Sequence, residues 1–311
     1  MVEGVSGRTE RWFDAGAAAL RRTLTAHSFT SEVAELDRRF PDGAYACPCC
    51  LVAYGRGALA DEPRTLTEEH VPPELAGGKE LLLTCSRCNN ASGRVWDVHA
   101  SRHQHLQDAV LGRVGDPVQT TLTISGFPVR GRFDGSGAMP SFKYVPKVND
   151  PAVATAAGAF LEQAIDAGAE IEFQISYTRQ NNGDAAAWSW IRSAYLAAFA
   201  VYGYKFTLLQ ALGPVRLRLA SPQPAPALQL VVGVPSPSGP PQMFLIREPE
   251  HLRGLMVSFG HVLVFLPAWD FPRKVSDIEQ GVIALRTGKI PRLLVKAIAW
   301  PTEPQYLLDS N

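Results

Sequence analysis

Two cysteine pairs with the spacing C-x-x-C constrain this chain more than any other feature. Cys47 and Cys50 form the first pair, and Cys85 and Cys88 form the second. The spacing is typical of a structural zinc site, in which four thiolates close a tetrahedral shell and leave no position open for substrate. We therefore expect zinc to clamp two turns together. Cys49 is the fifth cysteine and could replace Cys50, although a C-x-C corner is less usual.

Composition narrows the class of protein without identifying it. The chain has 311 residues, and 30 basic and 30 acidic side chains cancel to a formal net charge of zero. A nucleic-acid partner would therefore need a local basic patch. No signal-peptide pattern and no apolar run of about 18 residues occurs, so we expect no membrane segment and a reducing, cytoplasmic location.

The segment between the cysteine pairs carries residues suited to phosphate chemistry. Glu69 and His70 are adjacent, and they combine an oxygen ligand for Mg²⁺ with a nitrogen base whose ordinary pKa is near neutrality. Asn89 and Asn90 follow the second pair at the start of a predicted helix and can offer amide oxygen to the same ion. A Glu-His pair alone is more often a surface turn, but its position between two zinc knuckles favours a site.

The order CPCC, EHVPP, LAGG and TCSRCNN, over about residues 45 to 105, resembles the zinc-containing branch of the HNH endonucleases. The resemblance implies a ββα-metal hairpin and helix held by the four-cysteine zinc site. It further implies hydrolysis of DNA phosphodiester bonds, with RNA not excluded, and a catalytic Mg²⁺ or Mn²⁺. In that family the residues matching Glu69 and Asn89 hold the catalytic ion, and the histidine matching His70 is the general base.

One position departs from the family pattern. The asparagine that orients the base lies about five residues before the second knuckle in that family, where this chain has Glu80. Either Glu80 or a backbone carbonyl would have to orient His70. An alternative is therefore a catalytically inactive, zinc-stabilised nucleic-acid-binding module. A zinc hydrolase of another substrate is a weaker alternative, because four thiolates leave the zinc no open position.

The helix after the second knuckle carries further polar residues. Asp97 lies eight residues after Asn89, about 12 Å along a helix, so the two should not share an ion. We expect Asp97 to cap or salt-bridge within the module, with a DNA-backbone contact as the alternative. Three histidines on this helix should be surface residues: His99, His103 and His105. Three arginines are the candidates for phosphate contact: Arg87, Arg94 and Arg102.

Patterning predicts an α+β chain of three segments: an N-terminal helical segment 1–43, the zinc-knuckle module 44–112, and a larger mixed α+β accessory domain 113–311. Apolar periodicity predicts one or two helices over 8–39, broken near 25–30, and helices over 94–111, 151–168 and 185–212. Asp150 is the expected N-cap of the third, and Gly203 a break in the last. Strands are expected at 120–124, 129–133, 170–177, 215–219, 228–234, 243–246 and 261–265.

The two flanking segments carry no catalytic pattern. The N-terminal helices are predicted to be scaffold, or alternatively a DNA-contacting arm that uses Arg8, Arg11, Arg21 and Arg22. Residues 191–219 loosely resemble a segment that accompanies this module in other bacterial proteins. The C-terminal half is accordingly expected to be a scaffold or target-selecting domain, with four possible backbone contacts: Arg179, Lys205, Arg216 and Arg218.

Overall fold

A computed structural model describes residues 6–60, 65–110, 117–135, 141–176, 182–234, 239–271, 273–289 and 292–309. The chain is mixed α+β and forms two compact units. The first unit combines Met1–Ala100 with Gly183–Asn311, and the second is Ser101–Asn182. The predicted accessory segment 113–311 is thus shared between the two units. Among the described residues, every helix is too short or too polar to span a bilayer.

The N-terminal segment is two helices, α1 (Gly7–Ala26) and α2 (Thr30–Arg39), and this confirms the predicted break. Ser6 caps α1, because its hydroxyl accepts a hydrogen bond from the Thr9 amide at 3.2 Å. Trp12 and Phe13 are buried on the inner face of α1, which packs on β1 of the cysteine-bearing segment. The helix therefore shares its core with the predicted site.

The cysteine-bearing segment forms two antiparallel hairpins and a helix. The first hairpin pairs β1 (Ala44–Ala46) with β2 (Ala53–Gly55), and the second pairs β3 (Leu66–Val71) with β4 (Lys79–Cys85). Helix α3 (Ser86–Ser92) follows β4 directly. A π-helical turn, Gly93–Asp97, joins it to α4 (Val98–Val110), which accounts for the helix predicted from Arg94; the last predicted residue, Leu111, is outside the described ranges.

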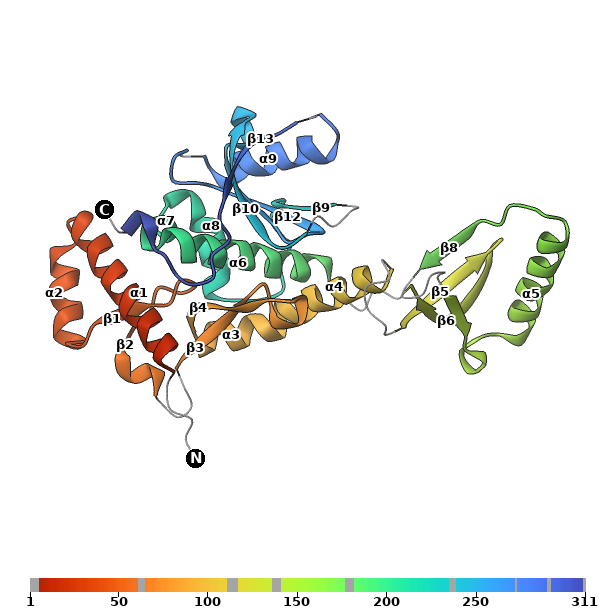
Figure 1. The fold of residues 1–311 in the computed structure, drawn as a ribbon, viewed down its shortest axis with the longest axis horizontal. Helices are drawn as coiled ribbons and strands as arrows, with labels where there is room; N and C mark the ends of the chain where they lie inside the picture. Colours follow the sequence, from red (N-terminus) through yellow and green to blue (C-terminus); the bar gives the residue numbers. More distant parts are fainter. Residues whose placement is uncertain are drawn as a thin grey trace. The chain divides into compact units, whose positions relative to one another are not determined.

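A helix buried on all sides, α6 (Gly183–Tyr202), runs through the first unit (Figure 1). Every residue from Trp188 to Tyr202 is buried. The predicted helix 185–212 is broken at the expected glycine: α6 ends before Gly203, whose φ of 83° is in the left-handed region. A β-carbon there would clash with the Asp309 carboxylate, which accepts hydrogen bonds from the next two backbone amides. This position therefore requires glycine.

Two short helices follow, α7 (Tyr204–Thr207) and α8 (Gly213–Ala220). The strand predicted over Val215–Leu219 was wrong, because that segment is α8. The alternation Val-Arg-Leu-Arg-Leu suggested a strand, yet only residues four apart are buried: Val215 and Leu219 lie inside, whereas Leu217 is 77% exposed. Pro214, near the start of the helix, fits that position because it needs no hydrogen-bonded amide.

The C-terminal part of the first unit is a five-stranded antiparallel sheet in the order β13-β10-β11-β12-β9. Strands were predicted where β9, β10 and β12 occur, but β11, β13 and the accompanying helix α9 were not. The bounds are β9 (Val231–Gly233), β10 (Gln242–Glu248), β11 (Gly254–Ser258), β12 (Val262–Leu266), α9 (Val275–Arg286) and β13 (Leu294–Ile298).

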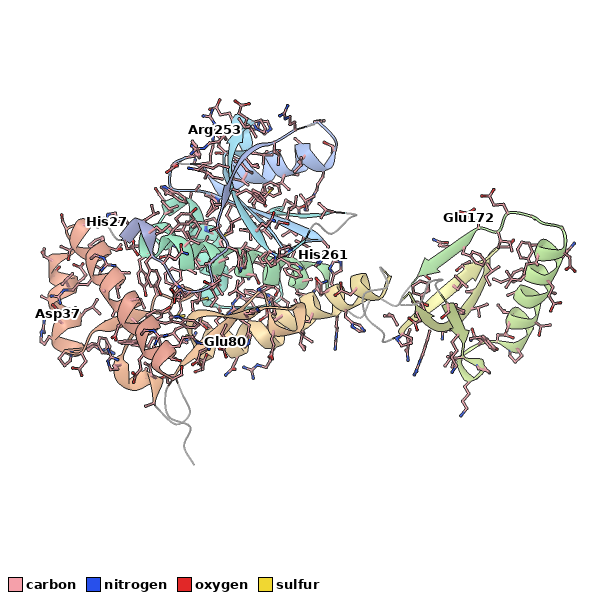
Figure 2. All side chains as sticks on the ribbon, viewed as in Figure 1. His27, Asp37, Glu80, Glu172, Arg253 and His261 are labelled. Carbon is pink, nitrogen blue, oxygen red and sulfur yellow. The ribbon has the colours of Figure 1, made fainter. Side chains whose placement is uncertain are left out.

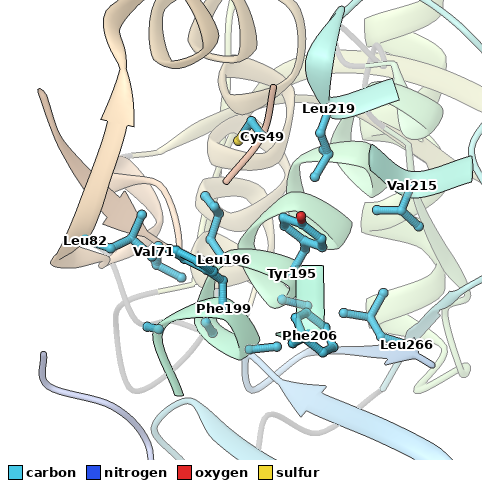
Figure 3. Packing of buried hydrophobic residues seen from close by; sticks show 14 of the residues in the cluster. Cys49, Val71, Leu82, Tyr195, Leu196, Phe199, Phe206, Val215, Leu219 and Leu266 are labelled. Atoms are coloured by element: carbon cyan, nitrogen blue, oxygen red, sulfur yellow. The ribbon is translucent and has the colours of Figure 1, made fainter. Parts of the chain in front are cut away.

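One hydrophobic core joins the C-terminal sheet, α6 and the cysteine-bearing hairpins. Figure 3 shows Tyr195, Leu196 and Phe199 of α6 among side chains from the other elements, including Leu82 of β4 and Leu266 of β12. Tyr195 also donates a hydrogen bond to the Pro48 carbonyl at 2.9 Å, inside the first cysteine knuckle. The candidate site is therefore built into the core of this unit.

The second unit is a four-stranded antiparallel sheet, in the order β7-β6-β5-β8, with one helix packed on it (Figure 1). The predicted hairpin, the predicted N-cap at Asp150 and the following helix are all confirmed. Part of the predicted strand 170–177 is present, although Tyr177 lies beyond the described ranges. The bounds are β5 (Val118–Ile124), β6 (Phe127–Asp134), β7 (Ser141–Tyr144), α5 (Pro151–Asp166) and β8 (Phe173–Ser176).

Candidate metal centre and catalytic site

The two cysteine pairs meet in one cluster. The sulfur atoms of Cys47, Cys50, Cys85 and Cys88 all lie within 4.8 Å of one another, and the Cys50 and Cys85 sulfurs are 3.8 Å apart. Four thiolates around zinc at about 2.3 Å would lie about 3.8 Å apart along the edges of a tetrahedron. The cluster could therefore hold a metal such as zinc.

The backbone around the cluster supports that interpretation. The amide of Cys85 donates to the Cys47 sulfur at 3.3 Å, and the amide of Cys88 donates to the Cys85 sulfur at 3.5 Å. Burial raises the pKa of the Cys47 thiol. A bound cation would offset that cost, because metal ligation keeps cysteine ionised. Cys49 is buried but is not a member of this group of four.

The β3-β4 hairpin and α3 carry the predicted catalytic residues. Glu69 and His70 are consecutive on β3, and consecutive strand residues point to opposite faces of a hairpin. The amide nitrogen of Asn89, on α3, donates to the Thr67 hydroxyl at 3.1 Å, so α3 covers the face that Thr67 shares with Glu69. His70 lies on the other face. The hairpin thus brings Glu69 and Asn89 to one side and turns His70 to the other.

Glu69 takes part in a buried ion pair with a residue that sequence reasoning missed. The guanidinium of Arg192, from α6, donates to both Glu69 oxygens, with Nη1 to Oε1 at 3.0 Å. Thr84 on β4 adds a third hydrogen bond, from its hydroxyl to Oε2, at 2.8 Å. Glu69 is 3% exposed and Arg192 is 2% exposed. The ion pair ties the hairpin to the central helix.

The same guanidinium also faces Asp97, whose Oδ2 is 3.7 Å from Nη1 of Arg192. Asp97 accepts a further hydrogen bond from the Ser189 hydroxyl. Asp97 therefore forms a salt bridge, but with α6 and not within the cysteine-bearing module as expected. Burial acts to lower the pKa of Arg192, but the negative charges of Glu69, Cys49 and Asp97 outweigh it and raise that pKa well above its usual value.

A divalent ion does not fit Glu69 as these residues lie. Both carboxylate oxygens accept hydrogen bonds from a guanidinium, and that cation already compensates the charge that would attract a metal. An ion bound between Glu69 and Asn89 would have to displace Arg192 from a nearly solvent-free site.

His70 is partly exposed and has a carboxylate across the hairpin. In the β3-β4 register it lies directly opposite Glu80, beside a β-bulge, so the two side chains share a face. Glu80, labelled in Figure 2, forms an ion pair with Arg8 at the start of α1. The next strand residue on this face, Glu68, accepts a hydrogen bond from Thr9. The first turn of α1 therefore borders the face that carries His70.

The predicted phosphate contacts differ in their surroundings. Arg87 and Arg94 are exposed and form no ion pair with the part of the chain that is described. Arg102 is also exposed, but it already interacts with another residue of the chain. In the C-terminal half, Arg216 donates to the Thr207 carbonyl and Arg218 lies over the Trp188 ring, so both stabilise the fold; Arg179 is outside the described residues.

Arg192 had one signal in the sequence. It lies in the run WSWIRSAYLAAFA, a helix that is apolar almost all round. Arginine is almost never fully buried unless it is paired, so a charge in such a helix predicts a buried acidic partner. The partner itself, 123 positions earlier in the chain, could not be chosen among 30 acidic residues without the fold.

Comparison with known proteins gives no further information: no protein-family model, no curated protein and no solved structure matches this chain.

Proposed function

We propose that this chain is an endonuclease of the HNH type that hydrolyses phosphodiester bonds of DNA, with His70 as the general base. The observation that carries the proposal is the order strand, strand, helix with a partly exposed histidine on the first strand. Two cysteines at the junction of β4 and α3 cluster there with two from the β1-β2 turn. Such an order and such residue types are what the resemblance to the HNH endonucleases implies, and they support the proposal.

The chemistry assigned to this chain's own residues is proton transfer. His70, in its neutral form, takes a proton from a water molecule while the water oxygen forms a bond to phosphorus. The bond from phosphorus to the 3′ oxygen breaks, and a proton from solvent completes the 3′ hydroxyl product. We assign the orientation of the imidazole to Glu80, which lies opposite His70 in the hairpin register and also pairs with Arg8.

The metal requirement is a separate part of the proposal. Mg²⁺ or Mn²⁺ would supply charge stabilisation to the phosphate and to the leaving oxygen. Glu69 and Asn89 were the predicted ligands, but the pairing of Glu69 with Arg192 argues against that site. Cleavage that needs Mg²⁺ or Mn²⁺ and survives Glu69→Gln would indicate that other groups hold the ion.

A second candidate function is favoured by the same ion pair. A zinc-stabilised module that binds nucleic acid without cutting it has no need of an ion at Glu69, and the Glu69-Arg192 pair would then serve only the fold. Under this alternative the chain retards duplex DNA in a gel and leaves it intact with every divalent ion.

We expect His70→Ala to abolish cleavage of supercoiled plasmid, since loss of a general base typically costs on the order of 10²–10⁴-fold in rate. The zinc-loaded wild type is assayed with Mg²⁺, with Mn²⁺ and with neither. His105→Ala is the matched control, because His105 is an exposed histidine outside the hairpin. Nicking by wild type and His105→Ala alone supports the proposal; equal nicking by His70→Ala excludes His70 as the base.

A further inference from the structure

The sheet of the second unit has one covered face and one open face. Ile124 and Val129 point to the covered face, where they pack with Ala157 of α5 in a small hydrophobic cluster. Strand alternation places the neighbouring residues on the other side. On β6 the burial pattern confirms this, because Arg130 and Arg132 are exposed between buried residues. Nothing in the described part of the second unit covers that side.

The open face is basic. It carries Arg130 and Arg132 of β6 and Lys143 of β7, all exposed, with threonine and glutamine side chains on the neighbouring strand. None of these three cations has an ion pair among the described residues. Among the described strand positions on this face, Asp134 at the end of β6 is the one carboxylate, and the exposed Glu172 directly precedes β8.

Helix α5 differs in charge from the open face of the sheet. Helix α5, on the covered side, has the exposed acidic residues Glu162 and Asp166 and contains no lysine or arginine. Its N-cap, Asp150, is also acidic and exposed. Helix α5 is thus acidic, whereas the β6-β7 part of the open face is basic, so the field at these three cations favours a polyanion.

The arrangement of the cations costs stability. Arg132 and Lys143 are directly opposite each other in the β6-β7 register. Like charges at opposed positions of an antiparallel pair destabilise it. Arg130 is two residues from Arg132 on the same strand, about 7 Å away at the usual strand rise. Three unpaired cations within this distance are suited to neighbouring phosphates of a nucleic-acid backbone.

We propose that the open face of this sheet, defined by Arg130, Arg132 and Lys143, binds the phosphate backbone of DNA. Contacts of this kind position the nucleic acid without reading its sequence. The inference deepens the proposed function, on which it rests for its choice of DNA as the polyanion. It assigns the second unit the role of holding the substrate of the first.

The test is binding of a fluorescein-labelled 20-base-pair duplex by the full zinc-loaded chain, followed by anisotropy. His70→Ala is the parent protein, so that the duplex is not cut. The face variant is Arg130→Gln, Arg132→Gln and Lys143→Gln combined. The matched control is Arg38→Gln, Lys289→Gln and Lys296→Gln, which removes three exposed cations from the first unit.

The logarithm of the DNA-binding constant falls linearly with the logarithm of the salt concentration. Loss of three phosphate contacts should make this slope less steep by about 2.7, at about 0.9 per contact. Between 50 and 200 mM salt the parent should then lose roughly 40-fold more affinity than the face variant. The control should keep the parent's slope. The face variant should unfold at the parent's temperature or above it, because the opposed cations are gone.

An unchanged slope in the face variant, or an equal loss in the control, would overturn the inference. So would loss of binding to phosphatidylserine vesicles by the face variant with unchanged DNA affinity, since the partner would then be a membrane surface. Cleavage is scored separately on wild type. If wild type does not cut DNA but the face variant loses DNA affinity, the nuclease proposal fails and the binding face stands.

Discussion

Replacing Cys85 with serine should release the metal and unfold the hairpins of the first unit. Cys85 is buried at the junction of β4 and α3, where it provides one of four clustered sulfurs and accepts a hydrogen bond from the Cys88 amide. Structural zinc sites contribute about 10–16 kcal/mol of apparent binding free energy near pH 7, and much of it is folding free energy. A hydroxyl cannot replace a thiolate in such a shell.

Zinc content per chain and the thermal unfolding transition measure this effect. Wild type should contain one zinc per chain, and Cys85→Ser none, with a large fall in the unfolding temperature. Cys49→Ser is the matched control, because Cys49 is equally buried but lies outside the group of four. A Cys85→Ser protein that retains stoichiometric zinc and melts like wild type would contradict the assignment of the ligands.

Arg192→Met should lower the free energy of unfolding by about 3–5 kcal/mol, the usual cost of leaving a buried charge without its partner. The substitution leaves the Glu69 carboxylate 3% exposed and without its guanidinium. Combining it with Glu69→Met should recover most of the loss, because similar-sized apolar residues often replace a buried ion pair at little cost. Chemical denaturation of the zinc-loaded variants measures both changes.

A surface ion pair gives the matched control. Arg21 pairs with Asp37, and their side chains are 65% and 46% exposed, so Arg21→Met should change stability by no more than about 1 kcal/mol.

Stabilisation by Mn²⁺ distinguishes an ion pair at Glu69 from a metal site at the same residue. If Glu69 held Mn²⁺, the ion at 100 times its Kd would stabilise wild type by about 2.7 kcal/mol, and Glu69→Gln would abolish that gain. We expect no Glu69-dependent stabilisation.

The sequence predicted those structural features that depend on residues close together in the chain. The C-x-x-C spacing selected four cysteines that the fold brings within one cluster. The turn residues Ser125 and Gly126 both have positive φ, as a two-residue hairpin turn of type I′ requires, and the hairpin lies where it was expected. Asp150 caps α5 because its carboxylate reaches the Ala152 amide, two positions away. The turn and the cap lie within a few residues of the patterns that predict them, and each cysteine pair is itself a local pattern, although the fold brings the two pairs together.

Long-range choices were not predictable in the same way. Whether Glu69 would be a metal ligand or an ion-pair partner depends on Arg192, which reaches it only because α6 is buried against the hairpin. The alternation at Val215–Leu219 suits a strand by sequence, but its burial against neighbouring helices selects a helix. In both cases tertiary packing decides between states that local sequence allows.

The most direct test of the account is the single-turnover rate of duplex cleavage by zinc-loaded wild type and His70→Ala, with protein in excess over DNA. Matched zinc content and matched thermal unfolding ensure that the two proteins differ only at the base. The account predicts a rate that falls by on the order of 10²–10⁴-fold in the variant. Equal rates, or no cleavage by wild type with Mg²⁺ or Mn²⁺ while DNA binding is retained, would contradict it.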